Sequence, residues 1–156
     1  MNGLIEGVAA NTISTAFRWL IFGVMGRRIR ITHPREGETL MDPERCVPGG
    51  LCFQVRGTLK SLAENHEIWL LLADDAGRIW PQGFFAVHYD PYLKSWMGKI
   101  NGAGRTYVKI IAVVAPPTSQ DFFHYYQEQG RSTNFQPLNR LPAECLNAAS
   151  VRARIV

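Results

Sequence analysis

The sequence is poor in charge, in paired cysteines and in catalytic motifs, and each shortage narrows the functions that it can support. Asp, Glu, Lys and Arg make up 19% of the 156 residues, and the formal net charge is +4. The positive excess is local, at Arg27, Arg28 and Arg30. Nucleic-acid-binding domains usually carry a basic stripe over one face or a recognised motif. We therefore expect no nucleic-acid partner, and a basic cluster beside an apolar segment indicates a membrane surface.

The three cysteines, Cys46, Cys52 and Cys145, are not the even set that a secreted domain usually carries. Cys46 and Cys52 can close a small loop, CVPGGLC, but we favour free thiols in a reducing cytoplasm. The N-terminus also lacks the basic start and the small-residue cleavage site of a secretory signal. We expect a cytoplasmic protein, with the inner face of the cell membrane as a further option.

Motifs for catalysis and cofactor binding are missing from the sequence. The four histidines form no H-x-x-x-H or H-E-x-x-H pair, and no C-x-x-C is present for zinc. There is no G-x-S-x-G, no P-loop and no G-x-G-x-x-G at the start of a helix. A metal site built from the three cysteines and one histidine stays open as an alternative, as does catalysis by side chains distant in sequence. We expect no enzymatic activity, no catalytic residue, no metal and no cofactor.

Residues 3–26 are predominantly apolar and contain no proline, which predicts a helix. At about 1.5 Å per residue, such a helix is long enough to cross the hydrocarbon core of a membrane, which is about 30 Å thick. Its polar residues share one side of a helical wheel, and Arg18 near the middle of a lone spanning helix costs about 2.5–3.5 kcal/mol. We therefore favour packing on protein or attachment to a surface over true spanning. The residues that we assign to assembly or membrane attachment are Glu6, Asn11, Ser14, Arg18, Trp19, Phe22, Arg27 and Arg28.

From residue 27 onward the hydrophobic pattern changes from a helical to an alternating period, which predicts strands. Alternation places Leu51, Phe53 and Val55 on the inner face of one strand. Residues 66–73 are apolar almost throughout, as expected of a central strand covered on both faces, and Gly77 turns the chain into a hairpin with 78–88. The predicted strands are 28–33, 51–57, 66–73, 78–88, 94–100, 105–115 and 149–156.

A second change of period at residues 118–130 predicts a short helix before the last strand, ended by Gly130. Turn signals at about 8–12-residue spacing and the lack of a βαβ rhythm favour an antiparallel sandwich of about seven strands. We therefore predict a mainly β protein with an N-terminal helix over residues 1–26 and a β-sandwich domain over residues 27–156. Trp69 and Trp96 are predicted to form a pair in its core.

The order of several short motifs carries a resemblance that covers about residues 29–156. The motifs are Ile31-Thr32-His33-Pro34 with Gly37, Val55-Arg56-Gly57, Ile68-Trp69-Leu70, Trp80-Pro81-Gln82, Trp96 and Ile110-Ile111-Ala112-Val113. Their order resembles that of bacterial immunoglobulin-like β-sandwich domains. Such domains are attached to signalling, protease-like or other effector modules, so the resemblance implies a binding or interaction domain.

An aromatic cluster between residues 78 and 97 is the candidate binding surface. Aromatic rings interleaved with amide and guanidinium donors suit contact with a protein, a sugar or a stacked base. The alternative is that these rings fill the core of the sandwich, as aromatic residues often do. The residues that we assign to ligand or partner binding are Trp80, Gln82, Phe84, Tyr89 and Tyr92.

Together these features predict a non-enzymatic domain that binds a protein partner. Its N-terminal helix is expected to mediate homo-oligomer formation or membrane attachment through residues 3–26, because the sequence indicates no second domain to cover that apolar surface. The alternative is a membrane-disrupting effector, in which several such helices assemble in the bilayer and the β-sandwich senses a signal in the cytoplasm.

Overall fold

The computed structural model describes residues 28–46, 50–83, 86–102 and 106–155. The predicted N-terminal helix, and with it Glu6, Asn11, Ser14, Arg18, Trp19, Phe22 and Arg27, lies outside the described residues. Within them the chain is mainly β, as predicted, and has one helix, α2 (Pro117–Thr133). The strands are β1 (Arg30–His33), β2 (Thr39–Leu40), β3 (Glu44–Cys46), β4 (Gly50–Thr58), β5 (Glu67–Ala73), β6 (Ile79–Pro81), β7 (His88–Asp90), β8 (Ser95–Asn101), β9 (Tyr107–Ala115) and β10 (Ala148–Ile155).

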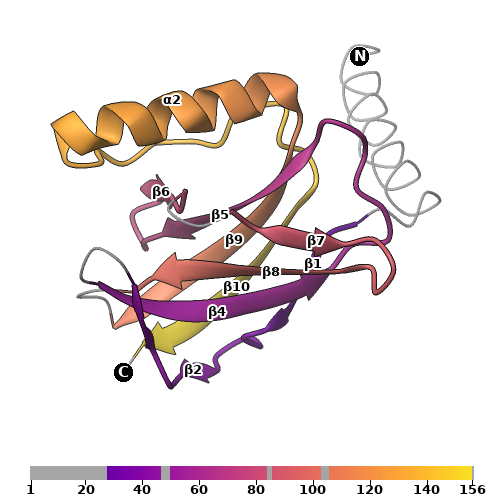
Figure 1. Cartoon of the computed structure of the whole chain (residues 1–156). Helices are drawn as coiled ribbons and strands as arrows, with labels where there is room; N and C mark the ends of the chain where they lie inside the picture. The colour runs from indigo at the N-terminus through magenta and orange to yellow at the C-terminus, as the bar shows by residue number, and fades with distance from the viewer. Residues whose placement is uncertain (1–27, 47–49, 84–85, 103–105, 156) are drawn as a thin grey trace, which may run out of the picture.

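These strands form two five-stranded sheets (Figure 1). Sheet A has the order β1-β4-β8-β7, with β3 also paired to β4, and sheet B has the order β2-β10-β9-β5-β6. The strand pairs are antiparallel apart from β2 and β10, which run parallel. The two sheets share one buried cluster, and α2 lies on the other side of sheet B. The described part of the chain therefore has three layers.

The first buried cluster, here called the inner core, lies between the sheets. Phe53 and Val55 of β4 point into it, as the alternation predicts. Trp96 of the neighbouring strand β8 joins them from sheet A, and Leu70 of β5 faces them from sheet B. Leu51 was predicted to point inward as well, and this is wrong, because its side chain is 46% exposed. At the start of β4 the buried position belongs instead to Cys52.

The second buried cluster, here called the outer core, lies between sheet B and α2. Trp69 and Leu71 of β5 enter it, and the Trp69 ring stacks on Phe123 of α2 with centroids 4.9 Å apart. β5 is thus buried on both faces, which confirms the prediction of a central covered strand. Trp69 and Trp96 are both buried, but they lie in different cores and do not form the predicted pair. Sheet B separates them, because Trp69 lies on the face of β5 that points to α2, whereas Trp96 points from β8 of sheet A into the space between the sheets.

The strand predicted over residues 78–88 is divided between the two sheets. β6 ends at Pro81 in sheet B, and the chain then crosses to sheet A, where it continues as β7. One side-chain and one backbone hydrogen bond hold this crossing segment. The Gln127 amide of α2 donates to the Pro81 carbonyl oxygen over 2.9 Å. The backbone N–H of Gln82 donates to the carbonyl oxygen of Leu70 over 2.8 Å. These contacts come from elements distant in sequence, so local alternation did not indicate the division.

The predicted turn after β5 is present. Gly77 has φ +80°, in the region that favours glycine, and the Asp74 carboxylate accepts hydrogen bonds from the backbone N–H groups of Ala76 and Arg78. Desolvation raises the pKa of Asp74, but the hydrogen bonds and charge of Arg78 outweigh it and hold that pKa below its usual range. The carboxylate therefore stays available to organise the turn.

The predicted helix is longer than expected, because Gly130 does not end it. α2 continues to Thr133, and Asn134 terminates it in the left-handed conformation with φ +58°. Gly130 is buried within the helix, where a Cβ atom would collide with the Phe135 ring. The glycine therefore permits close packing of the chain that returns after the helix, and a sequence pattern does not distinguish this role from that of a stop.

Cys46 and Cys52 form a disulfide across the β3–β4 hairpin, with Cα atoms 5.6 Å apart, and Cys145 is a buried free thiol. Our preference for three free thiols is thus wrong in this structure. Pairing of β3 with β4 brings two cysteines that are six residues apart within bonding range, and this pairing was not predicted. Burial raises the pKa of the Cys145 thiol.

Candidate functional site

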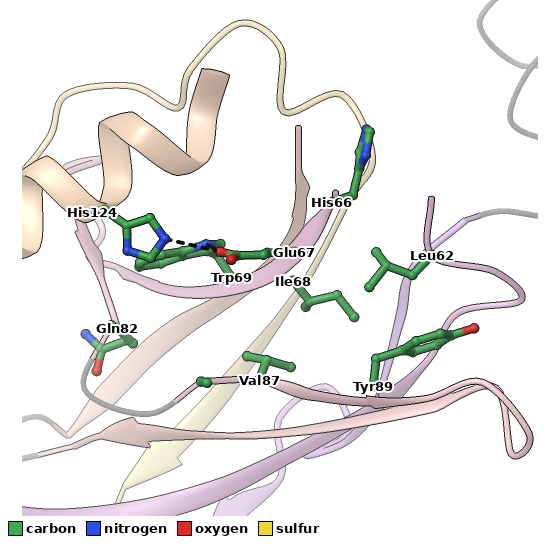
Figure 2. Close-up of a pocket in the computed structure, with 11 residues that line it drawn as sticks. Leu62, His66, Glu67, Ile68, Trp69, Gln82, Val87, Tyr89 and His124 are labelled. Carbon is green, nitrogen blue, oxygen red and sulfur yellow. Dashed lines mark hydrogen bonds and ion pairs between the residues drawn. The ribbon is translucent and has the colours of Figure 1, made fainter. Parts of the chain in front are cut away.

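A cavity of about 260 Å³ lies where the inner and outer cores meet. Its apolar walls come from both: Ile68, Val87 and Tyr89 belong to or pack against the inner core, whereas Trp69 belongs to the outer core. Figure 2 shows the cavity between β5 and α2 on one side and β7 with Leu62 on the other. The cavity exists because the chain changes sheet between β6 and β7, so neither core is closed at this edge.

A carboxylate is held at the mouth of the cavity by two neighbouring side chains. Oε2 of Glu67 accepts a hydrogen bond from Nε1 of Trp69 over 3.0 Å and lies 3.4 Å from Nε2 of His124. The imidazole of His124 meets the Trp69 ring edge to face, with centroids 5.2 Å apart. Glu67 and His124 are 46% and 60% exposed, so this pair contributes about 1 kcal/mol or less to stability. The arrangement therefore presents an oriented, accessible carboxylate beside an apolar hollow.

The remaining polar groups of the cavity are engaged by the fold. Nδ1 of His66 lies 2.9 Å from the backbone oxygen of Glu64, and the Tyr89 hydroxyl donates to the Leu59 carbonyl over 3.0 Å. Oε1 of Gln82 accepts from the backbone N–H of Asn101 over 2.9 Å. These bonds fix the walls, so that the Glu67 carboxylate is the group best placed to meet a ligand.

The structure brings only part of the predicted binding residues to this cavity. Gln82 and Tyr89 line it. Trp80 is half-buried in β6, with the Arg78 guanidinium 5.5 Å from its ring centroid, and Tyr92 is 94% exposed in the turn between β7 and β8. Phe84 lies outside the described residues. The four described residues therefore do not form one surface, although they are close in sequence.

The residues that sequence reasoning did not select as a site are Glu67, Trp69 and His124. Glu67 and His124 are 57 residues apart in the sequence, and the packing of α2 on β5 brings them together. The sequence signals available were the exposed position of Glu67 at the start of an otherwise apolar strand and the histidine within the aromatic run FFHYY. Neither pattern alone predicts a site, because edge carboxylates and helix histidines are common on solvated surfaces.

Arg28, assigned to assembly or membrane attachment, is the first described residue and is exposed. It lines an open groove of about 680 Å³ together with Arg30, Ile31 and Lys109. The groove lies where β1 approaches β10. Its three cations keep the region basic, in agreement with the local excess of positive charge in the sequence.

Within residues 28–155 as far as they are described, no group of three or more His, Cys, Asp or Glu side chains is arranged to hold a metal ion. In the same part of the chain, no helix has both the length and the apolar character needed to cross a membrane.

The chain matches no protein-family model and no curated protein sequence.

Proposed function

We propose that this chain is a non-enzymatic binding domain that takes a side chain of a protein partner into the cavity beside Glu67. Small-molecule and cofactor sites usually enclose about 300–1,000 Å³. The cavity, at about 260 Å³, is smaller than this range but large enough for one long side chain. The small volume of the cavity thus favours a single side chain over a small molecule as its occupant.

The chemistry of the cavity favours a lysine or arginine of the partner. A cationic side chain buries its aliphatic stem along apolar surface and keeps its charged end near polar groups. Val87, Ile68 and Trp69 offer the apolar surface, and the Glu67 carboxylate lies at the mouth for the charge. A charge-assisted hydrogen bond to a carboxylate already oriented by Trp69 requires little reorganisation of the site.

We also propose that the fold is an immunoglobulin-like sandwich, as the motif resemblance implies. In immunoglobulin constant-type domains one sheet holds the strands ABED and the other CFG. The order β1-β4-β8-β7 corresponds to A-B-E-D, and β10-β9-β5 corresponds to G-F-C. This correspondence supports the family resemblance and, with it, a role in interaction rather than catalysis.

The N-terminal part of the proposal is self-association or membrane attachment through residues 3–26. It rests on the sequence of that segment and on the basic residues that follow it. A cytoplasmic location belongs to the same proposal, and the Cys46–Cys52 disulfide argues against it, because structural disulfides persist mainly in oxidising compartments.

Photo-crosslinking of the full chain tests the cavity. A photoreactive residue at Ala86, at the cavity wall, is expected to give a covalent adduct with a distinct protein in an extract of the source cells. The same residue at Ala76, an exposed position in the turn after β5, serves as the matched control and is expected to give none. The Glu67→Lys substitution should abolish the adduct, and Asp75→Lys should leave it unchanged. An adduct that survives Glu67→Lys, or that forms equally from position 76, contradicts the proposal.

The alternative function, a membrane-disrupting effector, rests on the polar stripe of Glu6, Asn11, Ser14 and Arg18. Release of a dye from vesicles by the assembled full chain distinguishes it from a binding domain. Lack of release under every condition that gives oligomers eliminates the alternative.

A further inference from the structure

One end of sheet A combines basic and apolar side chains with the point at which the N-terminal segment joins the domain. The strand register defines this end: Arg30 of β1 pairs with Thr58 of β4, Thr58 pairs with Ser95 of β8, and Ser95 pairs with Asp90 of β7. The β7–β8 turn and the start of β1 therefore lie in one row (Figure 1).

The β7–β8 turn carries the two most prominent apolar side chains of this end. Tyr92 is 94% and Leu93 74% exposed. The turn is nevertheless fixed, because the Asp90 carboxylate accepts hydrogen bonds from the backbone N–H groups of Tyr92 and Leu93 over 2.8 and 3.0 Å. In addition, the Leu59 N–H donates to the Lys94 carbonyl oxygen over 3.0 Å. A turn held in this way keeps both side chains directed outward, away from the cores.

Cations surround the turn. Arg30, Lys60 and Lys94 are exposed, and the bond between Leu59 and Lys94 places the two lysines on adjacent segments. Against these three cations the turn carries the Asp90 carboxylate, which accepts the two backbone N–H groups, whereas Glu64 and Glu67 belong to neighbouring segments. The backbone next to Glu64 is tied to α2 by the Gln120 amide, which donates to the Asn65 oxygen, and Glu67 is engaged at the cavity. The corner of sheet A formed by Arg30, Lys60 and the β7–β8 turn is therefore locally basic, although the whole end of the domain is not.

We propose that this corner, formed by Arg30, Lys60, Tyr92, Leu93 and Lys94, lies against the surface of a membrane that contains anionic lipids. Tyrosine and leucine side chains partition into the headgroup region, and each lysine or arginine near an anionic surface adds attraction. The inference rests on the membrane attachment proposed above, because the 27 residues that precede Arg28 join the domain at this same end. An apolar segment that attaches there brings the corner, and not the opposite end, to the lipid.

Contact of this corner with the membrane fixes the orientation of the domain. The opposite end, with Met41 (73% exposed) after β2 and Tyr107 (68% exposed) at the start of β9, points away from the membrane. The cavity beside Glu67 opens between β5, β7 and α2, at the side of the domain. A partner in solution can therefore reach it while the corner is in contact with lipid.

Binding of the full chain to vesicles tests the charge in this surface. Vesicles of phosphatidylcholine alone are compared with vesicles that also contain phosphatidylserine. We expect tighter binding to the anionic vesicles, and Lys60→Gln with Lys94→Gln should lower that binding about 10-fold or more. Arg131→Gln with Arg140→Gln, which removes two exposed cations on α2 and after it, is the matched control and should have a much smaller effect.

A fluorescent probe tests the orientation. An environment-sensitive dye is attached to Leu93→Cys and, for comparison, to Met41→Cys; Cys145 is buried and the other two cysteines are bonded, so the new thiol is the accessible one. We expect the emission of the dye at position 93 to shift to the blue with anionic vesicles and that at position 41 to stay constant.

The outcomes separate this inference from the proposed attachment. Vesicle binding without dependence on phosphatidylserine, with equal signals at positions 93 and 41, overturns the orientation but leaves the attachment intact. A blue shift at position 93 that grows with protein concentration in the absence of vesicles assigns the corner to contact between copies and overturns the lipid assignment. Lack of binding to either vesicle overturns both proposals.

Discussion

The two faces of β5 offer a comparison within one strand, because Leu70 points into the inner core and Leu71 into the outer core, and both are fully buried. The inner core is made mainly of sheet residues that alternate along their strands. The outer core depends on a helix and on the segment that returns after it, through Phe123, Leu138 and Cys145. The inner core thus ties the two sheets into one unit, whereas the outer core attaches a separate layer to a sheet that is already complete.

The largest expected effects come from large-to-small substitutions in each core. Leu70→Ala should lower the free energy of unfolding by about 2–5 kcal/mol, and Phe123→Ala should lower it by about 3–5 kcal/mol. The two variants should differ in the segments that they destabilise. Leu70→Ala should raise hydrogen exchange throughout both sheets, whereas Phe123→Ala should raise it first in α2 and residues 134–147. Equal exchange patterns would show that the outer layer is not a separate unit.

Substitution of one glycine beside each core by alanine extends the comparison, with a smaller expected effect on stability. Gly57 lies in sheet A, where a Cβ atom would collide with the backbone oxygen of Arg30 and with the Trp96 ring. Gly57→Ala should therefore cost about 3 kcal/mol, at the upper end of overpacking effects. At Gly130 the obstacle is the half-buried Phe135 side chain, which can rotate, and alanine favours the helix by about 1 kcal/mol. Gly130→Ala should change stability by about 1 kcal/mol or less in urea unfolding, and a loss as large as that of Gly57→Ala contradicts the comparison.

The smallest expected effect concerns the Tyr126 hydroxyl in the outer layer. Among the described residues this oxygen is buried without a hydrogen-bond partner, and burial raises the pKa of Tyr126 above 10.0. The folded state thus favours the protonated phenol, so its stability contribution is present below the unfolded pKa and is lost as the pH rises through the folded pKa. Tyr126→Phe should be neutral or stabilise by about 1 kcal/mol at pH 7 and should reduce the loss of stability above about pH 10. A thermal unfolding series against pH measures both, and an unchanged alkaline slope contradicts the assignment.

Alternation predicted the strands that sit well inside the sheets. β9 and β10 follow the predicted residues closely, and Ala153 and Ile155 point inward while Arg152 and Arg154 point outward, as expected. The division of residues 78–88 between two sheets was not predicted, because it depends on Gln127 and Leu70, which lie far away along the chain. The role of Gly130 was misjudged for another reason: Phe135 is only five residues further on, but it reaches Gly130 because Asn134 turns the chain back in the left-handed conformation.

The sequence by itself determined the mainly β character, the central buried strand, the short helix and the scarcity of catalytic motifs, because these depend on local periodicity and on residue types. The tertiary structure alone decided that Trp69 of β5 faces α2, that Trp96 of β8 faces the space between the sheets, and that Cys46 and Cys52 meet. It also decided that Glu67, Trp69 and His124 share the mouth of one cavity. Packing of α2 on sheet B creates that proximity, and the side-chain contacts that select this packing join residues too far apart in the chain for any local pattern to record.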